Sequence, residues 1–490
     1  MQIARSSGGA AMEARGDLRS ILPYLPVVLR GGALFWPPAA QEALKALALG
    51  PDVSRVSSGD VLADALADLR LALNLDPLPR RAAEGFALFF DDLLSRAQAR
   101  DWFDHVAPSL ARLLLRLPTL LEGHYRAAGD EARGLRILSS QDAGLVLLSQ
   151  ELAAALLACA LFCLFPTADR AEACLPAINF DSLFAALCYN SRQSQEQKVR
   201  CLVHYFDRVT ASTPTGSVSF ERKVFSSGLI EDEEQEALEV DFANRYLGGG
   251  ALSRGCVQEE IRFMINPELI VGMLFMVSME DNEAIEIVGA ERFSQYMGYG
   301  SSFRFTGDYL DSKPFDAMGR RKTRIAAIDA LDCPTRLQFE PSGLLREVNK
   351  AFCGFLDQSN HQLYAKLVQD LNTKDNCRSV IPDECIGVST GNWGCGAFGG
   401  NPEIKSMIQW IAASQALRSF INYYTFESES LKRLEEVTEW ILRHKWTVGE
   451  LWHMLVEYSS QRLRGEINEG FLTWLLPKDI PNGDVDFMCE

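Results

Sequence analysis

From about residue 211 onward, short β-rich runs alternate with helical segments, and this alternation constrains the fold more than any other feature of the chain. Strands that alternate with helices predict an α/β sandwich around a mixed sheet. Ligands of such sheets bind outside the strand ends, where loops and helix N-termini gather. The predicted strands are residues 217–220, 238–242, 285–288, 324–329, 385–388 and 420–426.

The first 205 residues are predicted to be helical. They are rich in Leu and Ala at helical spacing and are interrupted by many prolines, which predicts a series of short helices. We therefore expect an all-helical accessory domain over residues 1–205 that supports the later sheet. Residues 152–165 form an apolar run of 14, short of the ~20 residues of a bilayer span, so we expect a buried helix and no membrane partner.

The remaining chain is expected to form one further domain and a tail. Residues 206–475 contain the β-rich runs and, beyond residue 427, more helices with apolar spacing. Residues 476–490 are predicted to be a loosely held tail. A chain of 490 residues with 47% hydrophobic residues is long and apolar enough for two or more packed units.

Net charge and cysteine spacing exclude several classes of function. The net charge of −17 argues against direct DNA binding, because affinity for a long polyanion depends on many Lys and Arg contacts to phosphates. The 12 cysteines contain no Cys-x-x-Cys pair, so we expect reduced thiols rather than a zinc site or a disulfide framework. The N-terminal residues show no secretory signal pattern, so we expect the protein to stay inside the cell.

Acids and amides flank a glycine cluster in the middle of the chain. The predicted strand at 238–242 delivers Asp241, Asn244 follows it, and three glycines occupy positions 248–250. A predicted helix then begins with Gln258-Glu259-Glu260. Hydrolysis of a glycosidic bond needs carboxyl groups at the scissile bond and polar groups on the sugar hydroxyls, and this pattern supplies both.

The two glutamates are expected to have different roles. Successive helical residues point about 100° apart, so Glu259 and Glu260 do not aim at one atom. The alternative is that both are ordinary acids of a first helical turn, favoured by the helix dipole and facing water. The residues taken alone leave both interpretations open.

A second glycine-rich loop lies between the predicted strand at 385–388 and a predicted helix that begins at Asn401. Five of the ten residues 391–400 are glycine. Asn401 suits an N-cap and Pro402 suits the first helical position. Backbone amides next to a helix N-terminus form an anion site, and a diphosphate would fit there.

Two other motifs match the same loop. Residues 394–399 satisfy the G-x-G-x-x-G dinucleotide fingerprint, with Glu427 as a candidate ribose ligand, which would indicate a nicotinamide or flavin oxidoreductase. Residues 387–391 satisfy the G-x-S-x-G nucleophile elbow around Ser389, with His444 or His453 downstream, which would indicate a serine hydrolase. The elbow requires a helix directly after its serine, and the glycines here favour a loop instead.

Together, the acid motif and the second glycine loop resemble the poly(ADP-ribose) glycohydrolase family. The resemblance rests on residues 240–244, the triple glycine, Gln258-Glu259-Glu260 and the loop at 390–400. It extends in the family's order over roughly residues 135–470, with further matches at 178–184, 261–269 and 325–331. It implies a macrodomain-like three-layer α/β/α sandwich with a mixed sheet, preceded by the all-helical domain and followed by C-terminal helices.

The resemblance also implies the reaction and its catalytic residues. The expected activity is hydrolysis of the ribose–ribose O-glycosidic bonds of poly(ADP-ribose), which releases ADP-ribose. Glu260 matches the general acid/base, Glu259 and Gln258 match residues that bind ribose hydroxyls, and Asp241 and Asn244 would orient the sugar and support the acids. A non-catalytic ADP-ribose reader is the main alternative.

Further substrate-binding residues are implied at matching positions. Glu231 would contact adenine, although it also suits a solvated acidic loop. Tyr299 would close over the ligand, and Phe426 would stack on adenine or ribose unless it is a core aromatic. The expected contacts in the two glycine-rich loops are Gly249, Gly250, Asn392, Gly394, Cys395, Gly396, Ala397 and Phe398. We expect the side chain of Glu260 and the loop around Gly396 to hold the same ligand molecule.

Partners and location follow from the same resemblance. We expect poly(ADP-ribose), ADP-ribose and poly-ADP-ribosylated proteins as ligands, a monomer, and no cofactor or metal ion. A role in the nucleus and the cytoplasm, in the DNA damage response, is expected. The basic run at 320–322 suits a solvated turn or, alternatively, a nuclear-import signal, and the Ala- and Arg-rich opening suggests a plant member.

Overall fold

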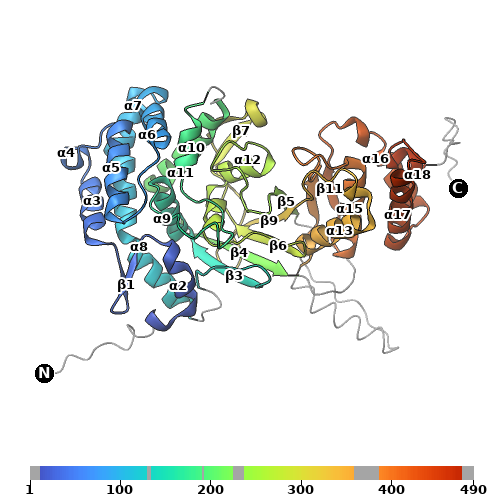
Figure 1. Cartoon of the computed structure of the whole chain (residues 1–490), viewed down its shortest axis with the longest axis horizontal. Helices are drawn as coiled ribbons and strands as arrows, with labels where there is room; N and C mark the ends of the chain where they lie inside the picture. The colour runs from blue at the N-terminus through green and yellow to red at the C-terminus, as the bar shows by residue number, and fades with distance from the viewer. Residues whose placement is uncertain (1–11, 130–133, 190–192, 225–236, 358–385, 477–490) are drawn as a thin grey trace. The chain divides into compact units, whose positions relative to one another are not determined.

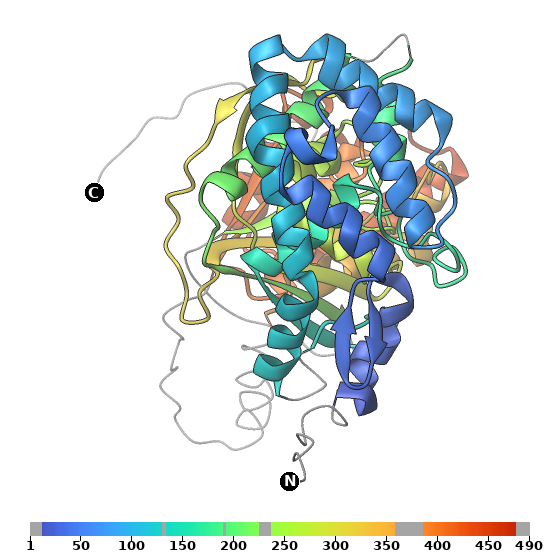
Figure 2. The ribbon, with the colours of Figure 1, turned by 90° about the vertical axis from the view of Figure 1, so that its left-hand side faces the viewer.

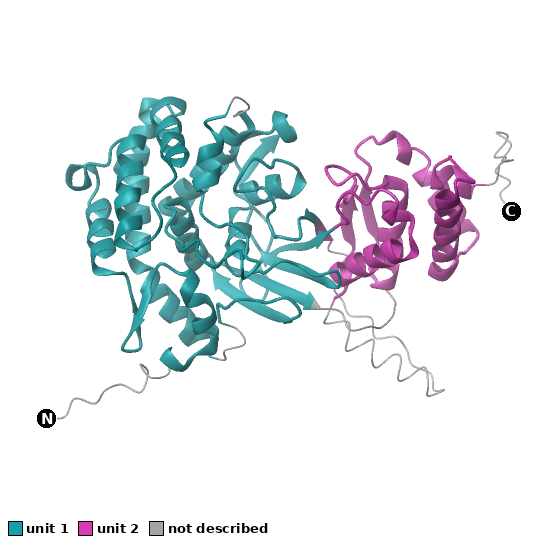
Figure 3. Cartoon of the chain, viewed as in Figure 1, with its two compact units in different colours: residues 1–225, 241–329 teal, residues 226–240, 330–490 magenta. Residues whose placement is uncertain are grey.

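The computed structural model describes residues 12–129, 134–189, 193–224, 237–357 and 386–476 (Figure 1). The chain divides into two compact units (Figure 3). Unit 1 contains Met1–Phe225 and Asp241–Asp329, and unit 2 contains Ser226–Val240 and Ala330–Glu490. Within the described residues, no helix combines the length and the apolar character of a membrane span.

The N-terminal part of unit 1 is mainly helical. Helix α8 packs against both α3 and α9, and the blue helices lie in front of the strands of unit 1 in Figure 2. Every residue of α9 except Glu151 is buried, which confirms the prediction of a buried apolar helix. The helices are α2 (Gly16–Ile21), α3 (Pro38–Ala48), α4 (Pro51–Ser54), α5 (Gly59–Ala72), α6 (Arg80–Ala87), α7 (Arg96–Asp101), α8 (Ala107–Ala128), α9 (Gln150–Leu161), α10 (Asp181–Ala186) and α11 (Gln193–Ala211).

Three strands interrupt the described part of this helical region, although residues 1–205 were expected to be all-helical. Strands β1 (Val28–Arg30) and β2 (Ala33–Phe35) form a small antiparallel hairpin. Strand β3 (Gly144–Ser149) pairs antiparallel with β4 (Ser217–Val224). The sequence of β3 is a short apolar run, and periodicity alone does not distinguish such a run from a buried helical segment.

The sheet of unit 1 is antiparallel and carries much of its core. Its order is β9-β6-β4-β3, where β6 is Glu283–Gly289 and β9 is Arg321–Asp329. Every residue of β6 is buried. A separate antiparallel hairpin pairs β7 (Ser294–Met297) with β8 (Arg304–Asp308). Helix α12 (Gln258–Ile265) carries the two predicted glutamates in its first turn.

Unit 2 supplies the parallel part of the fold. Strand β5 (Leu238–Ala243) spans the division between the units, and its first residues pair in parallel with β10 (Val388–Gly391). Strand β11 (Ile421–Tyr424) pairs in parallel with β10. Parallel and antiparallel pairs together confirm the predicted mixed sheet. The helices are α13 (Pro341–Phe355), α15 (Pro402–Gln415), α16 (Leu434–Arg443), α17 (Val448–Arg464) and α18 (Phe471–Leu475).

Two local predictions are wrong. Strand β10 begins at Val388 rather than ending there, so Ser389 lies in a strand and not in a loop. Ser, Thr and Gly favour turns, but here Thr390 hydrogen-bonds Gln409 on α15 at 2.5 Å, and the backbone of Ser389 pairs with strands on both sides. The basic run at 320–322 is not a solvated turn throughout, because β9 already begins at Arg321.

Candidate active site

Strand β5 carries Asp241 into the interior of unit 1. Its side chain is 1% exposed, and neither carboxyl oxygen has a hydrogen-bond partner among the described residues. Burial raises the pKa of Asp241 to about 7; the positive charge of Arg262 opposes this shift and the carboxyl of Glu260 adds to it. Asp241 is therefore a carboxyl group that retains its proton up to near neutral pH.

The triple glycine lies directly against the glutamates of α12. Gly248 and Gly249 have φ of 86° and 46°, in the left-handed region that favours glycine. A Cβ atom on Gly249 would lie 2.6 Å from Oε2 of Glu259 and 3.0 Å from Oε1 of Glu260. The absence of a side chain at this position is what allows backbone and carboxylates to approach each other.

Glu259 links the start of α12 to the chain that follows β5. Its Oε1 accepts a hydrogen bond from the backbone N–H of Gly248 at 2.6 Å, and its Oε2 accepts one from Asn244 at 2.9 Å. The side chain is 3% exposed, and burial, followed by the nearby Asp241, raises its pKa well above the usual value. Glu259 is thus a positioning group for the loop, and it does not face water.

Glu260 is held by two backbone amides. Its Oε1 accepts from Gly250 at 2.9 Å, and its Oε2 accepts from Val257 at 2.8 Å, which closes the first turn of α12. The side chain is 7% exposed. The alternative that both glutamates are solvated helix acids is therefore wrong.

Other predicted residues of unit 1 gather around the same turn. The side-chain carbonyl of Gln258 accepts from the backbone N–H of Phe242 at 2.8 Å, and that of Asn244 accepts from Tyr246 at 3.0 Å. Tyr299 lies between β7 and β8 and is largely exposed. Burial of part of its ring raises the pKa of Tyr299, while a hydrogen bond with the backbone of Gln258 lowers it, which places the hydroxyl at the N-terminus of α12.

The second glycine loop joins β10 to α15 within unit 2. Backbone hydrogen bonds within the loop hold it in shape. The N–H groups of Cys395, Gly399 and Gly400 donate to the carbonyls of Asn392, Gly396 and Gly394 at 3.0, 3.1 and 2.9 Å, respectively. Asn401 caps α15 as predicted, because its side chain accepts from the amides of Glu403 and Ile404. Among the described residues, no hydrogen bond engages the N–H groups of Gly396, Ala397 and Phe398. These donors and the helix N-terminus have the chemistry of an anion site.

The side chain of Asn392 connects this loop to the end of β11. The amide of Asn392 donates to the carbonyl of Thr425 at 2.9 Å and accepts from the hydroxyl of Tyr423 at 3.2 Å. Phe426 follows β11 with φ of 50° and is 73% exposed. The alternative that Phe426 is a core aromatic is therefore wrong, and its ring is available to a ligand.

The predicted residues thus form one group in each unit. Unit 1 gathers Asp241, Asn244, Gly249, Gly250, Gln258, Glu259, Glu260 and Tyr299 around the start of α12. Unit 2 gathers Asn392, Gly394, Cys395, Gly396, Ala397, Phe398 and Phe426 around the second loop. The expectation that both groups hold one ligand molecule stays a prediction. Glu231 lies outside the described residues.

Sequence reasoning missed Lys198, which reaches the first glycine loop from α11. Its ammonium group donates to backbone carbonyls within residues 250–255. A signal was present in the sequence: Lys198 occupies the same helical stripe as Leu202, Tyr205 and Val209, all of which are buried. A charge on an apolar stripe indicates a buried polar contact.

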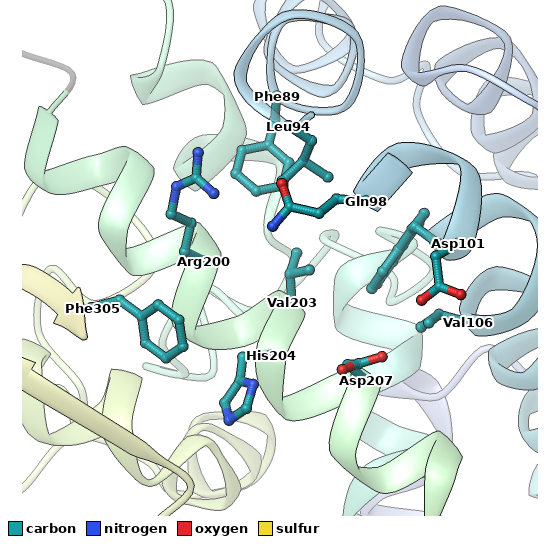
Figure 4. Close-up of a pocket in the computed structure, with 11 residues that line it drawn as sticks. Phe89, Leu94, Gln98, Asp101, Val106, Arg200, Val203, His204, Asp207 and Phe305 are labelled. Atoms are coloured by element: carbon teal, nitrogen blue, oxygen red, sulfur yellow. The ribbon is translucent and has the colours of Figure 1, made fainter. Parts of the chain in front are cut away.

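A cavity of about 180 Å³ lies elsewhere in unit 1 (Figure 4). Phe89, Trp102 and Phe305 line it, together with Arg200 and His204, and none of the predicted site residues does. It is smaller than the roughly 300–1,000 Å³ of most small-molecule sites. Arg200 pairs with Glu196 at 2.8 Å and His204 contacts Asp308 at 3.0 Å, so both side chains already have partners.

The motifs for the two alternative enzymes lie in different structural contexts. Ser389 lies inside β10, and α15 begins only at Pro402, so the strand–turn–helix geometry of a nucleophile elbow is absent here. The dinucleotide fingerprint does lie between parallel strands, with α15 between them. In the described ranges, no group of three His, Cys, Asp or Glu side chains is arranged to hold a metal ion.

Comparisons with known proteins identify the family. The family model "Poly (ADP-ribose) glycohydrolase (PARG), Macro domain fold" matches residues 210–433, and the helical-domain model of the same family matches residues 94–222. Poly(ADP-ribose) glycohydrolase 1 of Arabidopsis thaliana is 50% identical over 95% of this chain and 98% of that protein.

Two further relatives agree. The probable poly(ADP-ribose) glycohydrolase 2 of Arabidopsis thaliana is 46% identical over 95% of this chain and 99% of that protein. Poly(ADP-ribose) glycohydrolase 1 of Caenorhabditis elegans is 34% identical over 53% of this chain and 35% of that protein. The expectation of a plant member agrees with the two plant relatives, and neither the oxidoreductase nor the serine hydrolase is favoured. The chain belongs to the poly(ADP-ribose) glycohydrolase family.

Proposed function

We propose that this protein hydrolyses the ribose–ribose O-glycosidic bonds of poly(ADP-ribose) and releases ADP-ribose. Family membership over nearly the whole chain supports this activity. The single structural observation that carries it is the carboxyl group of Glu260, which is buried, held by the amides of Gly250 and Val257, and adjacent to the glycines at 249, 250 and 255. That arrangement suits a carboxyl group that must meet a sugar at a fixed position.

Glu260 is the general acid and base of this proposal. In the first step its carboxyl proton passes to the departing 2′-oxygen as the bond between that oxygen and the anomeric carbon breaks. A water molecule then bonds to the anomeric carbon, and its proton returns to Glu260. The residue therefore ends the cycle in the state in which it began.

The neighbouring acids support this proton transfer. Burial, with a smaller contribution from the carboxyl group of Glu260, raises the pKa of Asp241 to about 7. A proton is thus retained in this acid cluster near neutral pH, as general acid catalysis requires. Carboxylate charge also stabilises positive charge that develops on the ribose ring.

The second glycine loop is proposed to bind the diphosphate of the same substrate. The amides of Gly396, Ala397 and Phe398 and the N-terminus of α15 favour an anion. The exposed rings of Tyr299 and Phe426 suit stacking against adenine or packing against ribose. These contacts recognise one terminal unit, so they require no basic track along the polymer.

The decisive experiment measures free ADP-ribose after purified protein is incubated with poly(ADP-ribose). The wild-type chain should release ADP-ribose, and Glu260→Gln should lower turnover about 10²–10⁴-fold. Because Gln keeps the size and one acceptor oxygen, this variant should still bind ADP-ribose in calorimetry. A wild-type protein that binds ADP-ribose but releases none would instead be a reader, and the proposal would be wrong.

Partners and location complete the proposal. We infer that poly-ADP-ribosylated proteins are substrates, that the protein acts as a monomer without binding DNA, and that it works in the nucleus and the cytoplasm in the DNA damage response. The net charge of −17 supports weak affinity for DNA. Light scattering, DNA titration at stated salt, and imaging of a fluorescent fusion before and after DNA damage test these points separately.

A further inference from the structure

Lys198 is a buried lysine whose ammonium group contacts a single loop. Its side chain is fully buried, and Nζ donates to the carbonyls of Gly250, Ser253 and Gly255 at 3.2, 2.9 and 2.5 Å. An ammonium group has three donors, and these three carbonyls match that number. Gln195, one turn earlier on α11, donates to the carbonyl of Arg254 at 3.2 Å.

Burying this charge is costly, which indicates that the contact has a purpose beyond packing. Lysine is rarely fully buried, because removal from water disfavours the charged form. Burial accordingly lowers the pKa of Lys198 to about 8, while Cys256 and Glu260 partly oppose the shift. The ammonium form still predominates at neutral pH. An apolar side chain would fill the same space without this cost.

The loop that Lys198 holds by its carbonyls holds Glu260 by its amides. Gly250 accepts from Lys198 through its carbonyl and donates through its N–H to Oε1 of Glu260. Gly255 accepts from Lys198 as well, and a Cβ atom there would lie 2.5 Å from Oε1 of Glu260. The loop therefore lies between the ammonium group and the carboxylate and is fixed from both sides.

We propose that Lys198 is a positioning residue for glycosidic hydrolysis: it fixes the carbonyls of residues 250–255 so that the amide of Gly250 holds the Glu260 carboxylate at the scissile bond. This inference rests on the proposed function. Lys198 is assigned no contact with substrate. Its loss should consequently lower turnover much more than substrate affinity.

The test compares steady-state kinetics of the full chain with poly(ADP-ribose). Lys198→Met keeps the length of the side chain and removes the charge and donors. We expect kcat to fall 10- to 100-fold, with KM and the Kd for ADP-ribose within about threefold of wild type. Lys198→Arg, which restores donors, should recover much of kcat. Tyr205→Phe is the matched control, because Tyr205 is buried on the same helix and its hydroxyl has no hydrogen-bond partner among the described residues.

The outcomes separate this inference from the activity itself. If wild type releases no ADP-ribose, the proposed function fails. If wild type is active and Lys198→Met keeps kcat within twofold, or if KM rises in parallel with the loss of kcat, the positioning role is wrong. If Lys198→Met shows no cooperative unfolding transition, Gln195→Leu decides instead. This variant removes the hydrogen bond to the carbonyl of Arg254. A several-fold fall in kcat with an unchanged KM supports the inference, whereas an unchanged kcat contradicts it.

Discussion

The backbone N–H of Gly250 donates a 2.9 Å hydrogen bond to Oε1 of Glu260. This contact joins the two parts of the sequence motif, the glycine cluster and the helix of acids, into one structural element. The carboxylate thus owes its position to a loop as much as to its own helix. Substitutions in that loop should therefore alter catalysis even though the catalytic residue itself is unchanged.

Gly255→Ala should lower turnover sharply. The new Cβ atom would lie 2.5 Å from Oε1 and 2.6 Å from Cδ of Glu260, so the carboxylate must move. A misplacement of about 1 Å can cost roughly 100-fold in rate. We expect kcat to fall at least tenfold in the ADP-ribose release assay. Gly123→Ala is the control: this position is in α8 and has open space around its Cβ, so its kcat should equal that of wild type.

Because of Asp241, the free energy of unfolding should fall as the pH rises from about 4 to about 7. Its ordinary pKa is 3.8, and burial raises it to about 7 in the folded chain. The unfolded chain therefore releases this proton first, so the stabilising contribution is complete below pH 4 and is lost as pH approaches 7.

Urea unfolding of wild type and Asp241→Asn between pH 4 and 8 measures this dependence. Glu268, whose pKa burial raises to about 8, contributes a slope in the same direction in both proteins. The difference between the two proteins reports Asp241 together with its effect on the pKa of Glu259. Equal slopes would show that Asp241 ionises normally in the folded state.

Gly394→Ala should weaken ADP-ribose binding by disturbing the second glycine loop. Gly394 has φ of 72°, and a Cβ atom there would lie 2.4 Å from the Cβ of Ala330. Gly449→Ala is a control in the same unit but outside the proposed site, because its Cβ would meet only Oγ1 of Thr447, at 3.9 Å. Isothermal titration with ADP-ribose should show at least a tenfold higher Kd for the first variant and little change for the second. Similar affinities for both would place the ligand elsewhere.

Phe426→Ala should reduce ligand affinity with little effect on stability. The ring is 73% exposed, so its removal costs little packing in the folded protein. If the ring stacks on the ligand, its removal should weaken the free energy of binding by about 1–3 kcal/mol, which is a 5- to 150-fold rise in Kd. Leu310, which is 75% exposed, provides the comparison, and Leu310→Ala should change neither affinity nor melting temperature. Unaltered binding by Phe426→Ala would remove this residue from the site.

Local patterns predicted the parts of the structure that depend on local interactions. The Asn401 cap, the helix that starts at Gln258 and the buried helix α9 follow from capping chemistry and apolar spacing. The roles expected for Glu259 and Glu260 came from the family resemblance, and their burial could not be read from spacing. First-turn acids look the same whether they face water or a loop.

Features that depend on distant pairing escaped prediction. Strand β3 acquires its conformation from β4, about 70 residues later, and β10 extends to Gly391 because it pairs with β11 along its whole length and with β5 at Val388 and Ser389. Lys198 escaped for a similar reason, since its partners lie more than 50 residues away. Its position on an apolar stripe was the available sign.

The carboxylates of Glu259 and Glu260 occupy the volume that side chains at 249 and 255 would need. These positions therefore do not evolve independently. An alanine in place of either glycine would require a shorter acid, and loss of the acids would leave a void until larger loop residues filled it. Divergent copies that have lost hydrolytic activity should accordingly carry paired changes, with glycine and glutamate disappearing together.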